Sequence, residues 1–480
     1  MFWFMRVSVI GILIPLAFAT AGVATGWMWL APREGAGLEL RGPSTAGQMD
    51  VFRPDLPGEL EAGDARPGEG LPGSWPRFRG ANLDGISSEK VRLVDRWGEG
   101  GPKVLWSVDL GRGYAGAAVR RGRVYVLDYD EQRKGDLLRC MSLADGKDIW
   151  RRYYHVPIRR QHGVSRTVPA VTDRYVLTLG PFCHVLCLDA VSGDAKWSID
   201  LVHEYGTVVP DWYAGQCPLI DTVDGKQRAI LAPGGPEALM IAVDCETGKV
   251  LWRTPNPGKW RMSHSSIVPI ERWGTKMYLY CSMGGVAAVS VEDGEILWTY
   301  EKWKISPAVV ASPVIVGDDR IFLSGGYRAG SVMLDITDAK DGGLTVKEVF
   351  RLDHKGFGAE QQTPVLYRDH IYGVLPASAG ELGGQLVCLN LDGARLWASG
   401  PEDRFGLGPF IIADGKLLIM NDSGVLTMAR ATPNGYQQLA RAKVLNGHDS
   451  WAPLAIAGGR LLARDLKRMV CLDLRAGGTE

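Results

Sequence analysis

Short apolar runs recur along the chain and are separated by turns rich in Gly and Asp. Each unit opens with an apolar run that often follows a proline, as in Val168-Pro169-Ala170-Val171. A tight turn leads to a second run such as RVYVLDY, and a third run such as HVLCLDA ends close to an Asp. An SG, TG or DG turn then leads to a fourth run that ends in Trp. Short runs between turn residues indicate strands, so the pattern predicts units of four antiparallel strands.

The end of the fourth run marks each unit, and the markers repeat at a spacing of roughly 40 to 55 residues, which is typical of propeller blades. The eight markers are Trp106, Trp150, Trp197, Trp252, Trp298, Phe350, Trp397 and Leu439. The sequence therefore predicts an all-β fold, an eight-bladed β-propeller of four-stranded antiparallel blades over residues 103–480.

The two ends of this region complement each other. The run at about 103–109, KVLWSVD, reads as a fourth strand with no first three strands before it. The C-terminal stretch LLARDLKRMVCLDL reads as the middle of a blade that lacks its fourth strand. Pairing the N-terminal strand with the C-terminal blade would close the ring and leave no bare sheet edge at the seam.

Four of the eight cysteines occupy one slot of the repeat, just before its Asp or Asn. These are Cys140, Cys187, Cys388 and Cys471. Equivalent positions on successive units lie too far apart for a disulfide, so we expect small, buried core residues there. The other four cysteines have no assignment from the pattern.

The region before the propeller divides into three segments. Residues 1–32 contain an apolar run long enough to cross a bilayer as a helix, although small residues around Ala19 also fit a cleaved signal peptide. Both alternatives place the remainder outside the cytoplasm, in the periplasm or an equivalent extracytoplasmic space. Residues 33–74 are rich in Gly and Pro and predict a flexible linker. Residues 75–102 form a lead-in segment that contains WPRFRG.

The balance of charge argues against one class of partner. Basic and acidic residues number 54 each, and no long run of one sign occurs. Nucleic-acid binding depends on clustered Lys and Arg, so we expect no nucleic-acid partner.

The repeat resembles that of a known family. The pattern A-x-D-x-x-T-G-x-x-x-W, present as Ala242, Asp244, Thr247, Gly248 and Trp252, is similar to the tryptophan-docking repeat of quinoprotein propellers. That family includes alcohol dehydrogenases that use pyrroloquinoline quinone (PQQ) and BamB-like assembly lipoproteins that bind no quinone. WPRFRGANLDGIS also resembles a segment of exported bacterial PQQ-repeat proteins of unassigned activity. The chain lacks two features that the resemblance would bring: the adjacent Cys-Cys pair of the dehydrogenases and a lipidated N-terminal Cys.

Candidate site residues lie in the loops that join the last strand of one blade to the first strand of the next. In a propeller these loops meet at one mouth of the central channel, where aromatic walls with a few polar groups favour ligand binding. The candidates for ligand binding are Arg166, Trp212, Gln216, His264, Gln361, Arg404, His448 and Trp451. Two carboxylates, Glu360 and Asp449, could serve as a catalytic base.

Each candidate also has a purely structural interpretation. His264 and His448 could be histidines bonded to the backbone, and Asp449 could cap a turn. Arg166 and Arg404 could pair with surface acids. No spacing typical of a metal site is present, so we predict no bound metal from the sequence itself.

The sequence supports two functional hypotheses. The first is a membrane-tethered extracytoplasmic module that binds a ligand or an envelope or membrane protein through the loop-rich mouth. The second, implied by the resemblance, is a PQQ-dependent oxidoreductase acting on an alcohol or a sugar, with PQQ and Ca²⁺ as cofactors. Whether the protein is an enzyme stays open at this point.

Overall fold

The computed structural model describes residues 53–158, 163–338 and 343–477. The chain divides into two units, residues 1–44 and 45–480, and the described residues belong to the second. The predicted anchor or signal segment, residues 1–32, and the linker up to residue 52 lie outside the described residues. Within the described ranges, no helix is long and apolar enough to cross a membrane.

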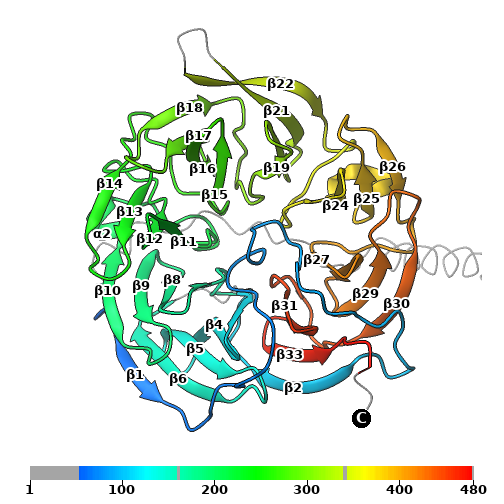
Figure 1. Ribbon diagram of the computed structural model, residues 1–480, viewed down its shortest axis with the longest axis horizontal. Coiled ribbons are helices and arrows are strands. Elements are labelled where there is room, and N and C mark those ends of the chain that lie inside the picture. Colours follow the sequence, from blue (N-terminus) through cyan, green and yellow to red (C-terminus); the bar gives the residue numbers. More distant parts are fainter. Residues whose placement is uncertain (1–52, 159–162, 339–342, 478–480) are drawn as a thin grey trace, which may run out of the picture. The chain divides into compact units, whose positions relative to one another are not determined.

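Eight sheets form a closed ring, and consecutive strands of each sheet are antiparallel neighbours (Figure 1). Blades 1 to 4 consist of β3 (Ala117–Arg120), β4 (Arg123–Asp130), β5 (Gly135–Ser142) and β6 (Asp148–His155); β7 (Ala170–Val171), β8 (Tyr175–Leu179), β9 (His184–Asp189) and β10 (Ala195–Asp200); β11 (Leu219–Val223), β12 (Lys226–Leu231), β13 (Ile241–Asp244) and β14 (Val250–Arg253); and β15 (Val268–Arg272), β16 (Thr275–Ser282), β17 (Gly285–Ser290) and β18 (Ile296–Tyr300).

Blades 5 to 8 continue around the ring. They consist of β19 (Val314–Val316), β20 (Arg320–Gly325), β21 (Gly330–Asp338) and β22 (Leu344–Leu352); β23 (Val365–Tyr367), β24 (His370–Val374), β25 (Leu386–Leu389) and β26 (Arg395–Ala398); β27 (Phe410–Ala413), β28 (Lys416–Met420), β29 (Val425–Arg430) and β30 (Gln438–Lys443); and β31 (Ala455–Ala457), β32 (Arg460–Arg464), β33 (Arg468–Asp473) and β2 (Lys103–Asp109). A short helix α2 (Leu201–Tyr205) follows β10, and a 3₁₀ helix η2 (Ala377–Leu382) precedes β25. The prediction of eight blades is confirmed.

The ring closes as the sequence predicts. β2 is the outer strand of blade 8 and pairs antiparallel with β33, with Lys103 opposite Asp473 and Trp106 opposite Cys471. All eight marker residues lie on the outer strands of their blades.

Blade 1 departs from the four-stranded pattern. β1 (Glu59–Ala62) pairs antiparallel with β6, which makes this sheet five-stranded. The linker prediction is therefore wrong for residues 59–62. The physical reason is that edge pairing uses backbone groups, so the segment needs little apolar surface of its own, and Leu60 is 39% exposed.

The recurring Trp and Gly pack against each other across neighbouring blades. The ring of Trp197 lies on Gly248 of the next blade, where a Cβ would come within 2.8 Å of the ring. The φ angle of Gly248 is +71°, which also favours glycine. Trp197 donates its Nε1–H to the carbonyl of Cys245 at 3.0 Å. The repeat is thus a docking unit between blades, and Trp106, Trp150 and Trp252 meet Gly146, Gly193 and Gly294 in the same way.

The inner strands are tied together by a chain of hydrogen bonds that the sequence did not predict. The N–H of Val168 donates to Cys217 Sγ at 3.2 Å, and the N–H of Cys217 donates to Ser266 Oγ at 3.0 Å. The N–H of Ser266 then donates to Ser312 Oγ, and that of Ser312 to Thr363 Oγ1. Five consecutive blade entrances are linked in this way. All eight cysteines are buried and free, so the expectation of core residues is confirmed for the four in the repeat slot.

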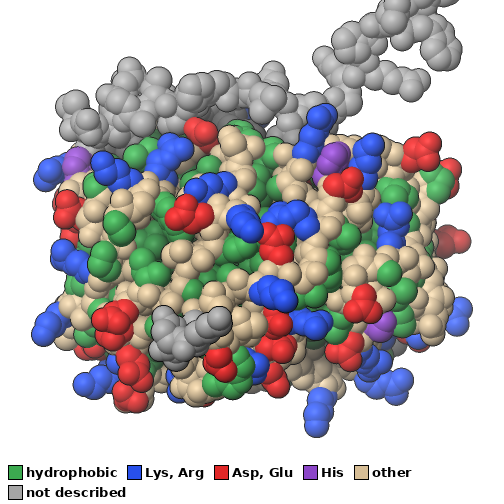
Figure 2. Space-filling view, turned by 90° about the horizontal axis from the view of Figure 1, so that it is seen from above, with side chains coloured by type: hydrophobic (Ala, Val, Ile, Leu, Met, Phe, Trp, Pro, Cys, Tyr) green, Lys and Arg blue, Asp and Glu red, His purple; other side chains and the backbone are tan. Residues whose placement is uncertain are grey.

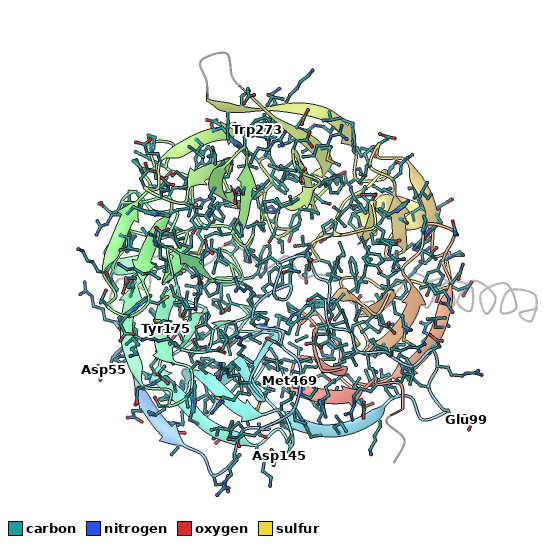
Figure 3. All side chains as sticks on the ribbon, viewed as in Figure 1. Asp55, Glu99, Asp145, Tyr175, Trp273 and Met469 are labelled. Carbon is teal, nitrogen blue, oxygen red and sulfur yellow. The ribbon has the colours of Figure 1, made fainter. Side chains whose placement is uncertain are left out.

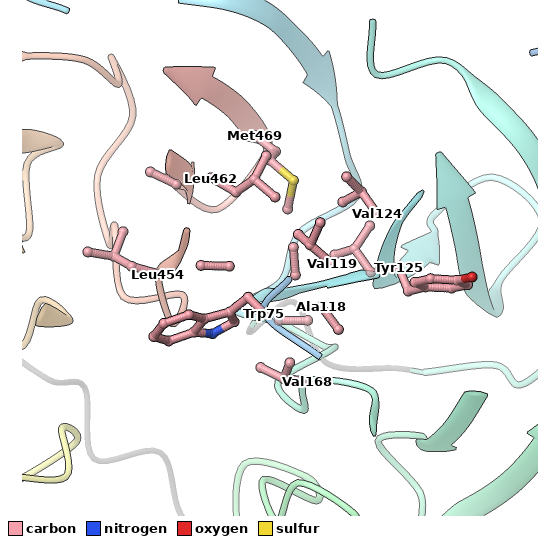
Figure 4. Close-up of a cluster of buried hydrophobic side chains, with 14 of the residues drawn as sticks. Trp75, Ala118, Val119, Val124, Tyr125, Val168, Leu454, Leu462 and Met469 are labelled. Atoms are coloured by element: carbon pink, nitrogen blue, oxygen red, sulfur yellow. The ribbon is translucent and has the colours of Figure 1, made fainter. Parts of the chain in front are cut away.

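The lead-in segment crosses the ring centre, where it runs as the blue trace between β1 and β2 (Figure 1). Trp75 pairs with Val119 of blade 1, and Ile86 pairs with Ile412 of blade 7. Figure 4 shows Trp75 among apolar side chains of blades 1 and 8, including Val119 and Leu462. The segment contacts the ends of the first strands, which lie away from the loops between blades. It therefore covers the face opposite the loop-rich mouth.

Candidate functional site

The mouth is defined here as the set of loops that join one blade to the next, together with Tyr114 before blade 1. Arg166 is the central charged residue of this mouth. Its Nε donates to the carbonyl of Trp212, and its guanidinium lies over the ring of Tyr114, with Cζ 4.8 Å from the centroid. The residue as a whole is partly exposed, but Nη2 is buried and has no hydrogen-bond partner among the described residues.

The charge of Arg166 is not balanced by an acid. Burial lowers the pKa of Arg166 to about 10, and the charges that act in the opposite direction are those of Tyr114, Tyr213 and Tyr327. No carboxylate of the described residues forms an ion pair with it. Burying a charge without a partner is costly, so the mouth has a built-in preference for an anion.

Tyr114 and Trp451 form an aromatic wall beside Arg166. Their rings stack with centroids 5.3 Å apart and an interplanar angle of 27°. Trp451 is fixed by its Nε1–H, which donates to Asp422 Oδ1 at 2.8 Å. The hydroxyl of Tyr114 donates to Asp449 Oδ2 at 3.4 Å. Burial raises the pKa of Tyr114 to about 12, so the phenol stays protonated.

His264 lies on the other side of Arg166. Its ring centroid is 6.4 Å from that of Trp212. Burial, and then the charge of Arg166, lower the pKa of His264 to about 4, so the imidazole is neutral at pH 7. Nδ1 is buried and has no partner among the described residues. Trp212 and Tyr213 both have positive φ, a strained backbone that holds this wall in place.

Glu360 lies near the mouth but at some distance from Arg166. It packs on Gly326, where a Cβ would come within 2.4 Å of the Glu360 Cγ. Burial raises the pKa of Glu360, and the charge of Glu360 contributes to the raised pKa of Tyr327. Burial is the main cause of the raised pKa of Tyr327, and the charge of Arg166 opposes that of Glu360 there.

The remaining candidates serve other purposes or stand alone. Gln216 is buried, and its Oε1 accepts from the N–H of Ala232 at 3.1 Å. Arg404 donates to the carbonyls of Glu381, Gly383 and Pro401 and so holds the η2 loop. The His448 side chain is 78% exposed and pairs with Asp449 at 3.2 Å. Gln361 is half-buried.

The structure therefore brings together Arg166, Trp212, His264, Asp449 and Trp451, with Glu360 nearby. Sequence reasoning missed Tyr114, Tyr213 and Tyr327. Tyr114 and Tyr213 lie in the loops before blades 1 and 3, so the same search for aromatic loop residues could have found them. Tyr327 lies in the turn between β20 and β21, and its only signal is the GGYRAG sequence of that turn.

The donor set does not fit a calcium and quinone pair. Across residues 53–158, 163–338 and 343–477, no group of three or more His, Cys, Asp or Glu side chains could hold a metal ion. Arg166 and the aromatic wall could receive a planar carboxylate, but they do not complete a calcium site. We therefore derive no oxidation step.

An eight-bladed ring of Trp-docked blades with a mouth of this kind defines the class of quinoprotein-like propellers. Residues 133–399, more than half of the chain, match the sequence profile of the family described as outer membrane protein assembly factor BamB. The chain belongs to this family. No curated protein matches the sequence.

Solved structures share the fold at low sequence identity. BamB from Moraxella catarrhalis is 14% identical with a TM-score of 0.52, covering 77% of this chain and 99% of its own. The quinohemoprotein alcohol dehydrogenase ADHIIG from Pseudomonas putida HK5 is 14% identical with a TM-score of 0.54, covering 85% and 81%. A europium-containing methanol dehydrogenase is 12% identical with a TM-score of 0.57, covering 84% and 90%. These similarities concern the fold alone.

Proposed function

We propose that the protein is an extracytoplasmic binding module whose mouth receives a carboxylate of a partner protein at Arg166. The observation that carries this proposal is the buried Nη2 of Arg166, which has no partner among the described residues. A carboxylate can bind a guanidinium through two parallel hydrogen bonds, which would restore the missing charge balance. The family description, an assembly factor of the outer membrane, supports a protein as the carrier of that group.

The aromatic wall supports the same function. Tyr114, Trp451 and Trp212 present large, ordered surfaces around the cation, and such residues dominate the energetics of protein interfaces. Neutral His264 adds hydrogen-bonding capacity without a second charge. Membrane tethering through residues 1–32 remains part of the proposal.

Site-specific photocrosslinking tests this function. A photoreactive amino acid in place of exposed His448, in cells that naturally make the protein, should give a discrete adduct with an envelope protein. Arg166→Gln should reduce the adduct on the order of tenfold or more, because it removes one partner of a desolvated charge pair. Lys304→Gln, which removes an exposed charge of another mouth loop, should change it by about twofold at most.

A second probe position serves as a control. Trp273 is 51% exposed in the turn between β15 and β16, at the strand ends far from the mouth. The same photoreactive group there should not give the adduct. An adduct from residue 448 with undiminished yield in Arg166→Gln would contradict the proposal.

Titration with PQQ tests the alternative function, a PQQ-dependent oxidoreductase. We expect no calcium-dependent, saturable quenching of tryptophan fluorescence, because no group of three or more His, Cys, Asp or Glu side chains among the described residues could hold a metal ion. Quenching that requires calcium and is lost in Arg166→Gln would instead support a quinone enzyme. Acetate at equal ionic strength provides the control for non-specific anion effects.

A further inference from the structure

A second cleft lies on the face opposite the mouth. Its volume is about 650 Å³, which falls within the usual range for small-molecule pockets. The lead-in segment forms one wall through Pro76 and Arg77, and blades 1, 2 and 3 form the others, blade 1 through Arg120. Tyr175, which Figure 3 labels in blade 2, lines this cleft.

The two arginines of the WPRFRG segment have different roles. Arg79 is buried and donates to four carbonyls, those of Leu83, Asp84, Thr363 and Pro364. Its donors are used inside the protein, so it anchors the segment. Arg77 makes a single hydrogen bond, from Nη1 to the carbonyl of Ile220 at 3.1 Å. Its Nε is buried and has no partner among the described residues.

The lining has four cationic side chains, Arg77, Arg120, Arg174 and Lys226, and three acidic ones, Asp173, Asp244 and Glu246. Arg120 pairs with Asp173, and Arg174 of the same turn as Asp173 pairs with Glu246, which also accepts from Tyr175. Asp244 Oδ1 accepts from the N–H groups of Glu246 and Thr247. No described carboxylate forms an ion pair with Arg77 or with exposed Lys226.

Asp221 does not neutralise Arg77 by contact. Its Oδ2 accepts from the hydroxyl of Tyr278 at 2.7 Å, and its Oδ1 accepts from the N–H of Thr222. Burial lowers the pKa of Arg77, the charge of Asp221 opposes this change, and the charge of Arg120 adds to it. The two guanidinium groups therefore repel each other across the cleft.

Neutral donors complete the lining. Thr172 donates to Gln227 Oε1 at 3.0 Å, which leaves the amide nitrogen of Gln227 to donate elsewhere. The Cβ position of Gly225 faces open space, with no atom within 4 Å. The cleft thus presents cations from two walls, with hydroxyl and amide groups nearby. Such a lining suits an anion that accepts hydrogen bonds from several directions.

We propose that this cleft binds a phosphate group, held by Arg77 from the lead-in segment and by Lys226 from β12. A tetrahedral phosphate offers oxygens to both walls at once, whereas a planar carboxylate would satisfy one guanidinium. The Nε and Nη2 edge of Arg77 supplies paired donors, and Lys226 supplies a point charge. On the side face in Figure 2, acidic and basic side chains are mixed.

Calorimetric titration of the full chain tests the site. The reference protein carries Arg166→Gln so that the mouth does not contribute, and ionic strength is held constant with chloride. Inorganic phosphate and glycerol 3-phosphate are the probes. We expect saturable binding at one site, weakened about tenfold or more by Arg77→Gln and several-fold by Lys226→Gln.

Matched variants keep the result interpretable. Gln at position 77 can still donate to the carbonyl of Ile220, so the fold should be kept, and an unchanged melting temperature checks this. Lys249→Gln, an exposed charge outside the cleft, should bind like the reference. Binding of both probes with similar affinity supports a site for free phosphate, and Arg77-dependent binding of glycerol 3-phosphate alone supports a phosphate ester. The proposal is overturned if neither probe saturates, or if Arg77→Gln binds as tightly as the reference.

Discussion

Replacing Arg464 with Met should destabilise the propeller by about 3–5 kcal/mol, the range for breaking a buried charge pair. Arg464 lies in β32 of blade 8 and is 1% exposed. Its guanidinium donates to the carbonyls of Gly111, Ala115 and Leu127, which belong to blade 1 and the segment leading into it. Nη2 also lies 3.7 Å from Asp128 Oδ1. The substitution would leave a buried carboxylate and three carbonyls without this donor.

Denaturation by urea measures this effect. Arg468→Met provides a matched control in the same blade, because its ion pair with Asp109 is exposed and should contribute about 1 kcal/mol or less. In the double variant Arg464→Met with Asp128→Asn, part of the loss should be recovered, since the buried carboxylate that has lost one of its two arginine partners, Arg464 and Arg139, is removed. Equal losses for Arg464→Met and Arg468→Met would show that Arg464 does not hold the seam.

Asp136→Asn should stabilise the protein more at pH 8 than at pH 5. Asp136 is 1% exposed, its Oδ2 accepts from the hydroxyl of Tyr154 at 2.6 Å, and Oδ1 has no partner among the described residues. Burial raises the pKa of Asp136 to about 7; hydrogen bonds from Tyr154 and the Leu137 N–H oppose this, and the charge of Asp128 adds to it.

The direction of the pH dependence follows from that pKa. The folded state holds the Asp136 proton more tightly than the unfolded state does, so the associated stability is fully present below about pH 4 and is lost as the pH rises through 7. Asn keeps the acceptor for Tyr154 without the charge. Between pH 5 and pH 8 we expect the stabilising effect of Asp136→Asn to grow by about 3 kcal/mol.

Melting temperatures between pH 5 and pH 8 check this prediction. Exposed Asp64 is the control, and Asp64→Asn should shift the melting temperature equally at both pH values. A parallel shift for Asp136→Asn would mean that the carboxyl does not titrate in this range.

The architecture could be predicted from the sequence because the residues that define a blade lie close together in the chain and recur along it. Each unit carries a turn Gly and a terminal Trp, and the Trp of one unit docks on the Gly of the next, as Trp197 on Gly248 shows. Because the units recur in register, they specify one topology. β1 escaped prediction because its stabilisation comes from the exposed edge of β6, which lies far from it in the sequence. The series of hydrogen bonds that involves Ser, Thr and Cys side chains was not predicted, because its members belong to different blades.

The candidate site was predicted only in part because loop position does not determine side-chain direction. Arg166, Trp212 and His264 meet as expected from the convergence of the loops. Arg404 comes from an equivalent loop, yet it turns to the carbonyls of the η2 segment. Tyr327 reaches the mouth from within blade 5, where the search by linker loops did not extend.

The pairing of β2 with β33 has a consequence for biosynthesis. β2 is among the first strands to leave the ribosome and β33 is the last, so the outer strand of blade 8 waits without its partner while the other blades are made. Long-range pairings of this kind fold slowly and expose unpaired edges in the meantime. A chain that ends before residue 468 would lack β33, so β2 and β32 would both keep an unpaired edge. Nascent and truncated forms are therefore natural substrates for chaperones.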